Sequence, residues 1–113
     1  MPRTDALRLP RQAPGIRPAA ERARDFEEID RGLSPAQAMV EAQRCVQCSN
    51  PPCAELGCPL ANQIPRWIDH VVGGRFEQAA RILAETSTMP EMCGKLCPQE
   101  SLCESRCVVG RVS

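Results

Sequence analysis

The sequence predicts a small all-α fold in which short helices are joined by irregular, cysteine-rich loops. Apolar residues recur at helical spacing in three segments, and no segment alternates apolar and polar residues as a half-buried strand would. Eight cysteines fall in two runs, and eleven prolines and seven glycines interrupt the chain. Because 113 residues with one tryptophan, two phenylalanines and no tyrosine make a thin core, we expect the cysteines to hold the fold together.

The first 24 residues predict an extended arm. Six arginines stand against two acidic residues in this stretch, and four prolines are interspersed among them. Such a composition is typical of an open segment rather than of a packed element. A solvated tail is the simpler interpretation, and an arm that docks on a partner, or on the rest of a larger chain, is the alternative. We therefore expect an arm over residues 1–24 and one folded domain over residues 25–113.

Two helix signals follow the arm. Phe26 and Ile29 lie three residues apart in an acidic stretch, which predicts a single helical turn that ends at the next glycine. Further on, Ser34 is a favourable N-cap, a proline suits the first helical position, and Gln37 completes a capping box. The sequence therefore predicts a helix over residues 35–44.

A helical hairpin is expected between the two cysteine runs. Its first helix ends at a Gly-Gly pair, and its second covers residues 75–85. The apolar stripe of the first helix is Ile64, Trp67, Ile68, Val71 and Val72, and that of the second is Phe76, Ala79, Ala80 and Leu83. We expect this hairpin to form the main core. The single histidine, His70, lies beside the first stripe, and we do not expect it to bind metal.

The cysteine runs themselves predict loops. Three prolines force extended or turn conformations on the first run, where regular structure is therefore not expected. The second run opens with a loop bounded by proline, and Pro98 can then begin a last short helix. On that helix Glu100, Cys103 and Cys107 would share one face, because they are spaced three and seven residues apart.

Charge and hydropathy exclude several classes of protein. Fourteen basic and fourteen acidic residues give a net charge of zero, so nothing global favours nucleic acid or an anionic membrane as a partner. No apolar run approaches the length of a membrane span, and the N-terminus lacks the apolar core of a signal peptide. We therefore expect a cytoplasmic protein. In that reducing compartment clustered cysteines indicate metal or redox work rather than a disulfide scaffold.

The spacing of the cysteines favours two [4Fe–4S] clusters. The first run reads C-x2-C-x4-C-x4-C-P and the second reads C-x3-C-P-x4-C-x3-C. Structural zinc usually takes two separated cysteine pairs, whereas Cys45, Cys48 and Cys53 supply three thiols within nine residues. Cys58 and Cys97 each precede a proline, which in two-cluster ferredoxins marks the cysteine that serves the other cluster. A zinc-stabilised, non-redox interaction module is the second interpretation, and disulfides are the third.

The two runs resemble a known family. "EAQRCVQCSNPPCAELGCP" followed by "CGKLCPQESLCESRCVVG" closely resembles the N-terminal iron–sulfur domain of the glutamate synthase small subunit, which also opens dihydropyrimidine dehydrogenase and related NAD(P)H-dependent flavin oxidoreductases. The resemblance runs from roughly Arg11 to Gly110. It implies a helical domain that binds two [4Fe–4S] clusters and passes electrons between a flavin and a partner subunit or a second active site.

The resemblance also implies a ligand set. The first cluster takes three cysteines of the first run and the last cysteine of the second, namely Cys45, Cys48, Cys53 and Cys107. The other cluster takes three cysteines, namely Cys58, Cys97 and Cys103. Family members use a non-cysteine oxygen ligand for its fourth position, and Glu100 is the best candidate inside this chain. A residue beyond Ser113 is the alternative, and Cys93 is expected to be a small buried residue rather than a ligand.

The sequence departs from the family pattern in its length. It ends at Ser113 and contains no G-x-G-x-x-G motif, so no dinucleotide site is expected in it. We expect an excised N-terminal domain rather than a stand-alone module, with FAD and NADPH bound only in a downstream region. The expected partners are that flavin- and NAD(P)H-binding region and a subunit resembling the glutamate synthase large subunit. By itself the chain is not expected to be catalytic, and neither nucleic acid nor a membrane is an expected partner.

Overall fold

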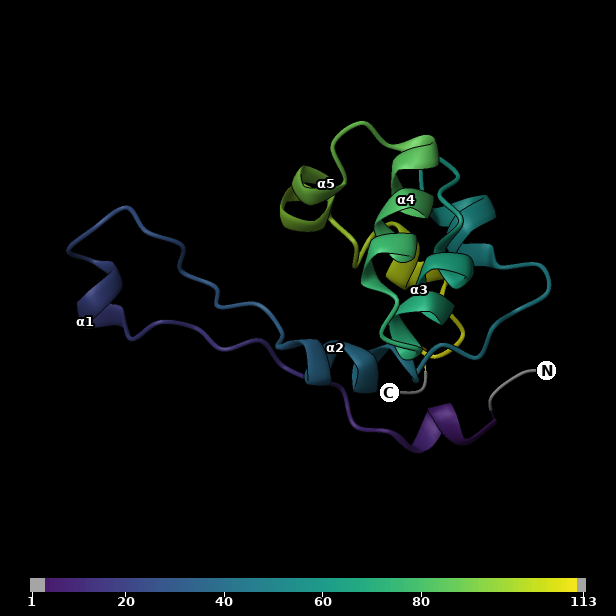
Figure 1. The fold of residues 1–113 in the computed structure, drawn as a ribbon, viewed down its shortest axis with the longest axis horizontal. Coiled ribbons are helices and arrows are strands. Elements are labelled where there is room, and N and C mark those ends of the chain that lie inside the picture. Colours follow the sequence, from purple (N-terminus) through teal and green to yellow (C-terminus); the bar gives the residue numbers. More distant parts are fainter. Residues whose placement is uncertain (1–3, 112–113) are drawn as a thin grey trace.

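The computed structural model describes residues 4–111, and over these residues the fold is helical (Figure 1). The elements in chain order are η1 (Thr4–Arg8), α1 (Ala19–Arg22), α2 (Pro35–Ala42), η2 (Cys53–Gly57), α3 (Ile64–Val72), α4 (Phe76–Thr86), α5 (Pro90–Leu96) and α6 (Cys103–Arg106). Within residues 4–111 the β structure consists of one isolated antiparallel bridge between Ile16 and Asp30. The predicted all-α fold is therefore confirmed. No described helix has the length and apolar character needed to cross a membrane.

The start of α2 follows from its capping box. Ser34 Oγ accepts a hydrogen bond from the Gln37 backbone N–H at 3.1 Å, and the Ser34 N–H donates to Gln37 Oε1 at 2.9 Å. This reciprocal pair gives a hydrogen-bond partner to each of two backbone N–H groups that would otherwise lack one at the helix end. The helix then ends at Ala42, two residues before the predicted end.

Helices α3 and α4 form the predicted hairpin. They pack against each other, and α3 also packs against α2. Gly74, at a φ of 72°, makes the turn between them. Buried Asn62 fastens the other end, because its Nδ2 donates to Leu83 O at 3.1 Å and to Thr86 Oγ1 at 2.8 Å. The hairpin is thus a rigid spacer between the two cysteine runs.

The buried face of α4 differs from the predicted stripe. Ala79 is buried as expected, but Ile82, absent from that stripe, is only 7% exposed, whereas Phe76 is 41% exposed. Residues three and four apart share a helix face, so Ala79, Ile82 and Leu83 form the side that packs inward. Phe76 is the first residue of the helix, and at this end of α4 its side chain reaches the surface.

The prediction of a helix that begins at Pro98 is wrong. Helix α5 forms instead in the region expected to be a loop, with Pro90 at its first position. Cys97 is extended, with φ of −63° and ψ of 135°, because a residue before proline is pushed out of the helical region. Helix α6 then covers four residues, Cys103–Arg106, so Glu100 lies on the preceding turn and Cys107 lies after the helix, and the three residues do not share a helix face.

The N-terminal segment folds back on itself. In place of the helical turn expected at Phe26 and Ile29, the structure has α1 earlier in the chain and an extended return. The Arg17 N–H donates to Ile29 O at 2.9 Å, and the Arg31 N–H donates to Gly15 O at 2.7 Å. Because these residues pair across two chain segments, they cannot also form a helix. We term residues 12–34 the hairpin arm; Figure 1 shows it projecting from the body with α1 at its tip.

The hairpin arm is attached to the body at its base and along one side. At the base, the Gln12 N–H donates to Glu41 Oε2 at 2.7 Å. Along the side, Lys95 of α5 forms an ion pair with Glu28. Before the arm, η1 lies on the body with Ala6 buried. The division of the chain at residue 24 stays a prediction.

Candidate metal centre

The first cysteine run folds as a loop that ends in one wide helical turn, η2. The Ala54 N–H donates to Pro51 O at 3.1 Å and starts the turn, and the Cys58 N–H donates to Cys53 O at 2.8 Å and closes it. Proline suits this start because its φ is already fixed near the helical value. The loop predicted for this run is present before Cys53, but the expectation that the run has no regular structure is wrong, because η2 is a helical turn with Cys53 and Cys58 at its two ends.

The second cysteine run places one cysteine inside a helix and three at helix ends. Cys93 lies within α5, and the Cys97 N–H caps that helix by donating to Cys93 O at 3.1 Å. Cys103 begins α6, and Cys107 follows its last residue. None of the eight cysteines forms a disulfide in the described structure, and each is half-buried.

Helix α6 packs directly against η2, which brings the two cysteine runs together. Gly57 makes this approach possible. A Cβ at this position would lie 2.8 Å from Cys103 Cα and 2.9 Å from Leu102 O, closer than such atoms tolerate. Both of these neighbours are backbone atoms, so neither can turn aside as a side chain could. A glycine is therefore required where the first run meets the second.

Four thiols contributed by both runs form what we term thiol group one: Cys45, Cys48, Cys53 and Cys107. Burial raises the pKa of Cys53 to about 11, and negative charge on Cys107, Cys45 and Cys48 raises it as well. Charges act strongly on a thiol only from nearby, so these three cysteines lie near Cys53. Cys107 has the largest effect of the three, although it lies 54 residues along the chain.

The remaining four thiols form thiol group two: Cys58, Cys93, Cys97 and Cys103. Burial raises the pKa of Cys97, and so do a hydrogen bond with Cys93 and negative charge on Cys93, Cys58 and Cys103. Burial also raises the pKa of Cys103, which the Glu104 N–H partly offsets by donating to the thiolate. Cys93 Sγ lies 3.6 Å from the hydroxyl of Ser87, a buried residue.

The cysteines predicted to bind the first cluster all lie in thiol group one, and those predicted to bind the second all lie in thiol group two. Ligation by these residues stays a prediction. Two placements differ in detail from what the sequence suggested. Cys93 is half-buried rather than buried, and its thiol contacts Cys97 within thiol group two. Glu100 is exposed, and within residues 4–111 its side chain makes no hydrogen bond or ion pair.

The donor chemistry of the thiol groups fits iron–sulfur clusters. Four cysteine thiolates are the donor set of a [4Fe–4S] cluster, and thiols gathered in this way resist ionisation unless a cationic centre compensates their charge. Zinc would need its donors at about 2.3 Å from one point. Among the described residues, no three or more His, Cys, Asp and Glu side chains are arranged as a site for a metal ion. Thiolates that bind different irons of one cluster do not have to converge on a single point.

Gln47 lies at the site, although no pattern in the sequence selects it. Its Nε2 lies 3.5 Å from Cys45 Sγ and donates to Pro65 O at 3.0 Å. A glutamine between two cysteines has no distinguishing spacing, so only the folded contact identifies it. His70 is elsewhere, and its Nδ1 accepts a hydrogen bond from Arg75 Nε at 2.9 Å.

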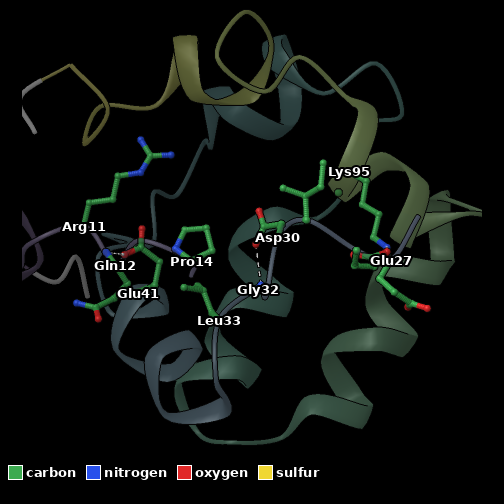
Figure 2. A pocket seen from close by; sticks show the side chains of 12 residues that line it. Arg11, Gln12, Pro14, Glu27, Asp30, Gly32, Leu33, Glu41 and Lys95 are labelled. Atoms are coloured by element: carbon green, nitrogen blue, oxygen red, sulfur yellow. Dashed lines mark hydrogen bonds and ion pairs between the residues drawn. The ribbon is translucent and has the colours of Figure 1, made fainter. Parts of the chain in front are cut away.

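A hollow of about 780 Å³ lies between the hairpin arm and the body (Figure 2). Its charged lining is largely paired within the protein. The Gly32 N–H donates to Asp30 at 2.7 Å, and Lys95 pairs with Glu28. None of the described residues that line it is a cysteine. The hollow is therefore separate from the thiol groups.

Comparison with known proteins gives one family and a consistent set of relatives. The family model described as dihydropyrimidine dehydrogenase domain II, 4Fe-4S cluster, matches residues 22–113. The glutamate synthase [NADPH] small chain of Azospirillum brasilense is 45% identical over 96 residues, which are 85% of this chain and 20% of that protein. The corresponding small chain of Escherichia coli is 42% identical over 101 residues, 89% of this chain and 21% of the relative.

A more distant relative extends the match. The glutamate synthase [NADPH] small chain of Bacillus subtilis is 32% identical over 114 aligned positions, which cover 94% of this chain and 23% of the relative. The chain therefore spans about a fifth of the length of the curated relatives that it matches.

Proposed function

The chain belongs to the family of dihydropyrimidine dehydrogenase domain II with its 4Fe-4S cluster, and we propose that it is an electron-transfer domain that carries two such clusters. The family and the relatives support an iron–sulfur domain of oxidoreductase type. The observation that supports the number two is the pair of thiol groups, each with four thiols contributed by both cysteine runs. When bound, [4Fe–4S] clusters accept and release single electrons.

In this proposal each thiol group holds one cluster. Thiol group one supplies all four ligands of the first cluster, and Cys58, Cys97 and Cys103 supply three ligands of the second. Glu100 is the proposed fourth ligand of the second cluster, since it follows Cys97 on the turn that leads to α6. Cys93 is the competing candidate, because its thiol already contacts Cys97. An oxygen ligand in place of a thiolate would change the reduction potential of that cluster.

The side chains of this domain hold and shield the clusters, and the substrates belong elsewhere. Half-buried thiols limit the access of water to the cluster, which helps to set its potential. We propose that electrons pass between a flavin- and NAD(P)H-binding region of the same protein, where FAD and NADPH would bind, and a subunit resembling the glutamate synthase large subunit. The proposed location is the cytoplasm, where free thiols are maintained.

The presence of clusters can be tested directly. The chain is purified without oxygen, and its iron, acid-labile sulfide, zinc and visible spectrum are measured. We expect a brown protein with about eight iron and eight sulfide per chain, as two [4Fe–4S] clusters require. A colourless protein that holds about two zinc ions after anaerobic purification, and that takes up no iron and sulfide on reconstitution, would support the non-redox zinc module instead.

The assignment of ligands predicts that the clusters are interleaved along the chain. Cys107→Ser is reconstituted anaerobically and its reduced state is examined by electron paramagnetic resonance. We expect it to perturb the same cluster that Cys45→Ser perturbs, because both thiols belong to thiol group one. If Cys107→Ser instead perturbs only the cluster that is lost in Cys97→Ser, each cysteine run builds its own cluster and the assignment fails.

Two matched variants test which residue is the fourth ligand of the second cluster. Under the proposal Glu100→Gln alters the signal of the second cluster, whereas Cys93→Ser leaves both signals largely intact. The reverse result would assign the position to Cys93.

A further inference from the structure

Gln47, between the first two cysteines, has an unusual backbone conformation. Its φ is 56°, in the left-handed region that glycine favours. For a residue with a side chain this conformation is strained, because the Cβ approaches the following carbonyl oxygen. Residues kept in such conformations by their surroundings concentrate at functional sites. The observed strain therefore directs attention to the contacts of this side chain.

The carboxamide of Gln47 is held between two acceptors. Its Nε2 donates to Pro65 O at 3.0 Å and lies 3.5 Å from Cys45 Sγ, within hydrogen-bond distance for sulfur. Pro65 O is a carbonyl oxygen and can only accept, so the amide nitrogen must be on this side. Because one N–H is used by Pro65 O, the other is available for the sulfur. Pro65 belongs to the first turn of α3, and the helical hairpin therefore fixes the orientation of the amide.

We propose that Gln47 is a positioning residue that orients the Cys45 sulfur and raises the reduction potential of the cluster held by thiol group one. The inference rests on the proposed function. Reduction adds negative charge that is shared with the ligand sulfurs, and an N–H donor stabilises a sulfur more strongly when it is more negative. The reduced state therefore gains more from Gln47 than the oxidised state does.

The test compares Gln47→Met with the wild-type chain after anaerobic reconstitution. Methionine has a similar length and no N–H, so it removes the donor with little change in volume. In a redox titration followed by electron paramagnetic resonance, we expect the ratio of reduced to oxidised group-one cluster at the wild-type midpoint to fall about threefold, as loss of one hydrogen bond implies. For a one-electron couple this is a midpoint about 28 mV lower, at 59 mV per tenfold. The potential of the other cluster should not change.

Two further variants separate this role from a structural one. Gln47→Lys keeps an N–H donor and adds positive charge, so its midpoint should be at or above the wild-type value. Gln43→Met removes an exposed glutamine at the end of α2 and should change neither potential. If Gln47→Met lowers the melting temperature but leaves the midpoint unchanged, the side chain only ties the loop to α3 and the proposal fails.

The remaining outcomes are also decisive. If Gln47→Met does not retain its cluster, Gln47→Lys decides, because a midpoint below the wild-type value overturns the proposal and one at or above that value supports it. Loss of the cluster from both variants, with the chain still folded, overturns the assignment of potential to this residue. A wild-type chain that takes up no iron and sulfide contradicts the proposed function itself, so the two failures are distinguishable.

Discussion

The α3–α4 hairpin and the cysteine loops on either side of it are held together by different means. The hairpin has two helices of nine and eleven residues, buried apolar side chains such as Ile82, and a buried asparagine that fastens its ends. The loops have η2 and α6, each a single short turn, and a backbone contact that only glycine permits. Their thiols are half-buried and repel one another when ionised.

This difference indicates which part of the domain folds by itself. Apolar burial stabilises the hairpin whether or not a cluster is bound. In the loops, the thiol groups become a source of stability only when a cationic centre joins them. We therefore expect the hairpin to be the frame and the loops to be the part whose order depends on a bound cofactor.

Removal of the clusters is expected to have the largest effect on the difference in stability between the loops and the hairpin. We expect the loops to lose their order and the hairpin to persist, with a loss of stability on the order of 10 kcal/mol, as for structural metal sites. Circular dichroism should show a lower helix content and a broad melt in the cluster-free chain, whereas the fluorescence of Trp67 in α3 should remain that of a half-buried indole. Identical thermal melts for the cluster-free and reconstituted chains would contradict this expectation.

Gly57→Ala should break the contact between the loops and spare the hairpin. The added Cβ would meet the backbone at Cys103, and overpacking of this kind costs about 1–3 kcal/mol. Iron content per chain and melting temperature should both fall.

The matched control for this variant is Gly94→Ala in α5, where a Cβ would meet no described atom within 4 Å. There alanine should be neutral or stabilising by about 0.5–1 kcal/mol, since it favours the helix. Equal losses of iron in the two variants would show that the approach of η2 to α6 is not what Gly57 provides.

Asn62→Ala is expected to have the smallest effect. In contrast to Gly57→Ala, it should weaken the hairpin and spare the cysteine loops. It removes the hydrogen bonds to Leu83 O and Thr86 Oγ1, at a cost of about 1–2 kcal/mol. Iron content after reconstitution should be unchanged, because the hydrogen bonds of this side chain in the described structure go to α4 and to no thiol. Gln63→Ala, an exposed neighbour, is the control for the melting temperature. Loss of iron at an unchanged melting temperature would place Asn62 in the cofactor site rather than in the frame.

The sequence predicts the frame well because its helices are long enough to show a period. The capping box at Ser34 and the stripe on α3 are local patterns. The box is found where it was expected, and helix α3 forms as predicted, but the side chains of its stripe are half-buried and none is buried. For α4 the helix itself was predicted correctly, but its buried stripe contains Ile82 and not Phe76. Local patterns of this length are sufficient because neighbouring turns of one helix determine them.

Elements of one turn, and contacts between distant segments, could not be predicted in this way. Helix α5 has seven residues and no clear period, and the hairpin arm is formed by backbone pairing, which leaves no side-chain signal. The contact of Gln47 with Cys45 depends on a left-handed residue that the sequence does not mark. Cysteine spacing indicated the kind of centre, while the neighbours of Cys93 became visible only in the folded chain.

The pairing of the first cysteine loop with Cys107 has a consequence for how the domain matures during its synthesis. A ribosome adds roughly 5–20 residues per second, so Cys107 is polymerised roughly 3–11 seconds after Cys53, 54 residues earlier. During that interval the nascent chain offers three closely spaced thiols without their fourth partner. On the proposed ligand set, a cluster can acquire its fourth ligand in thiol group one only after Cys107 has been translated, and we expect the first three thiols to need protection from oxidants until then.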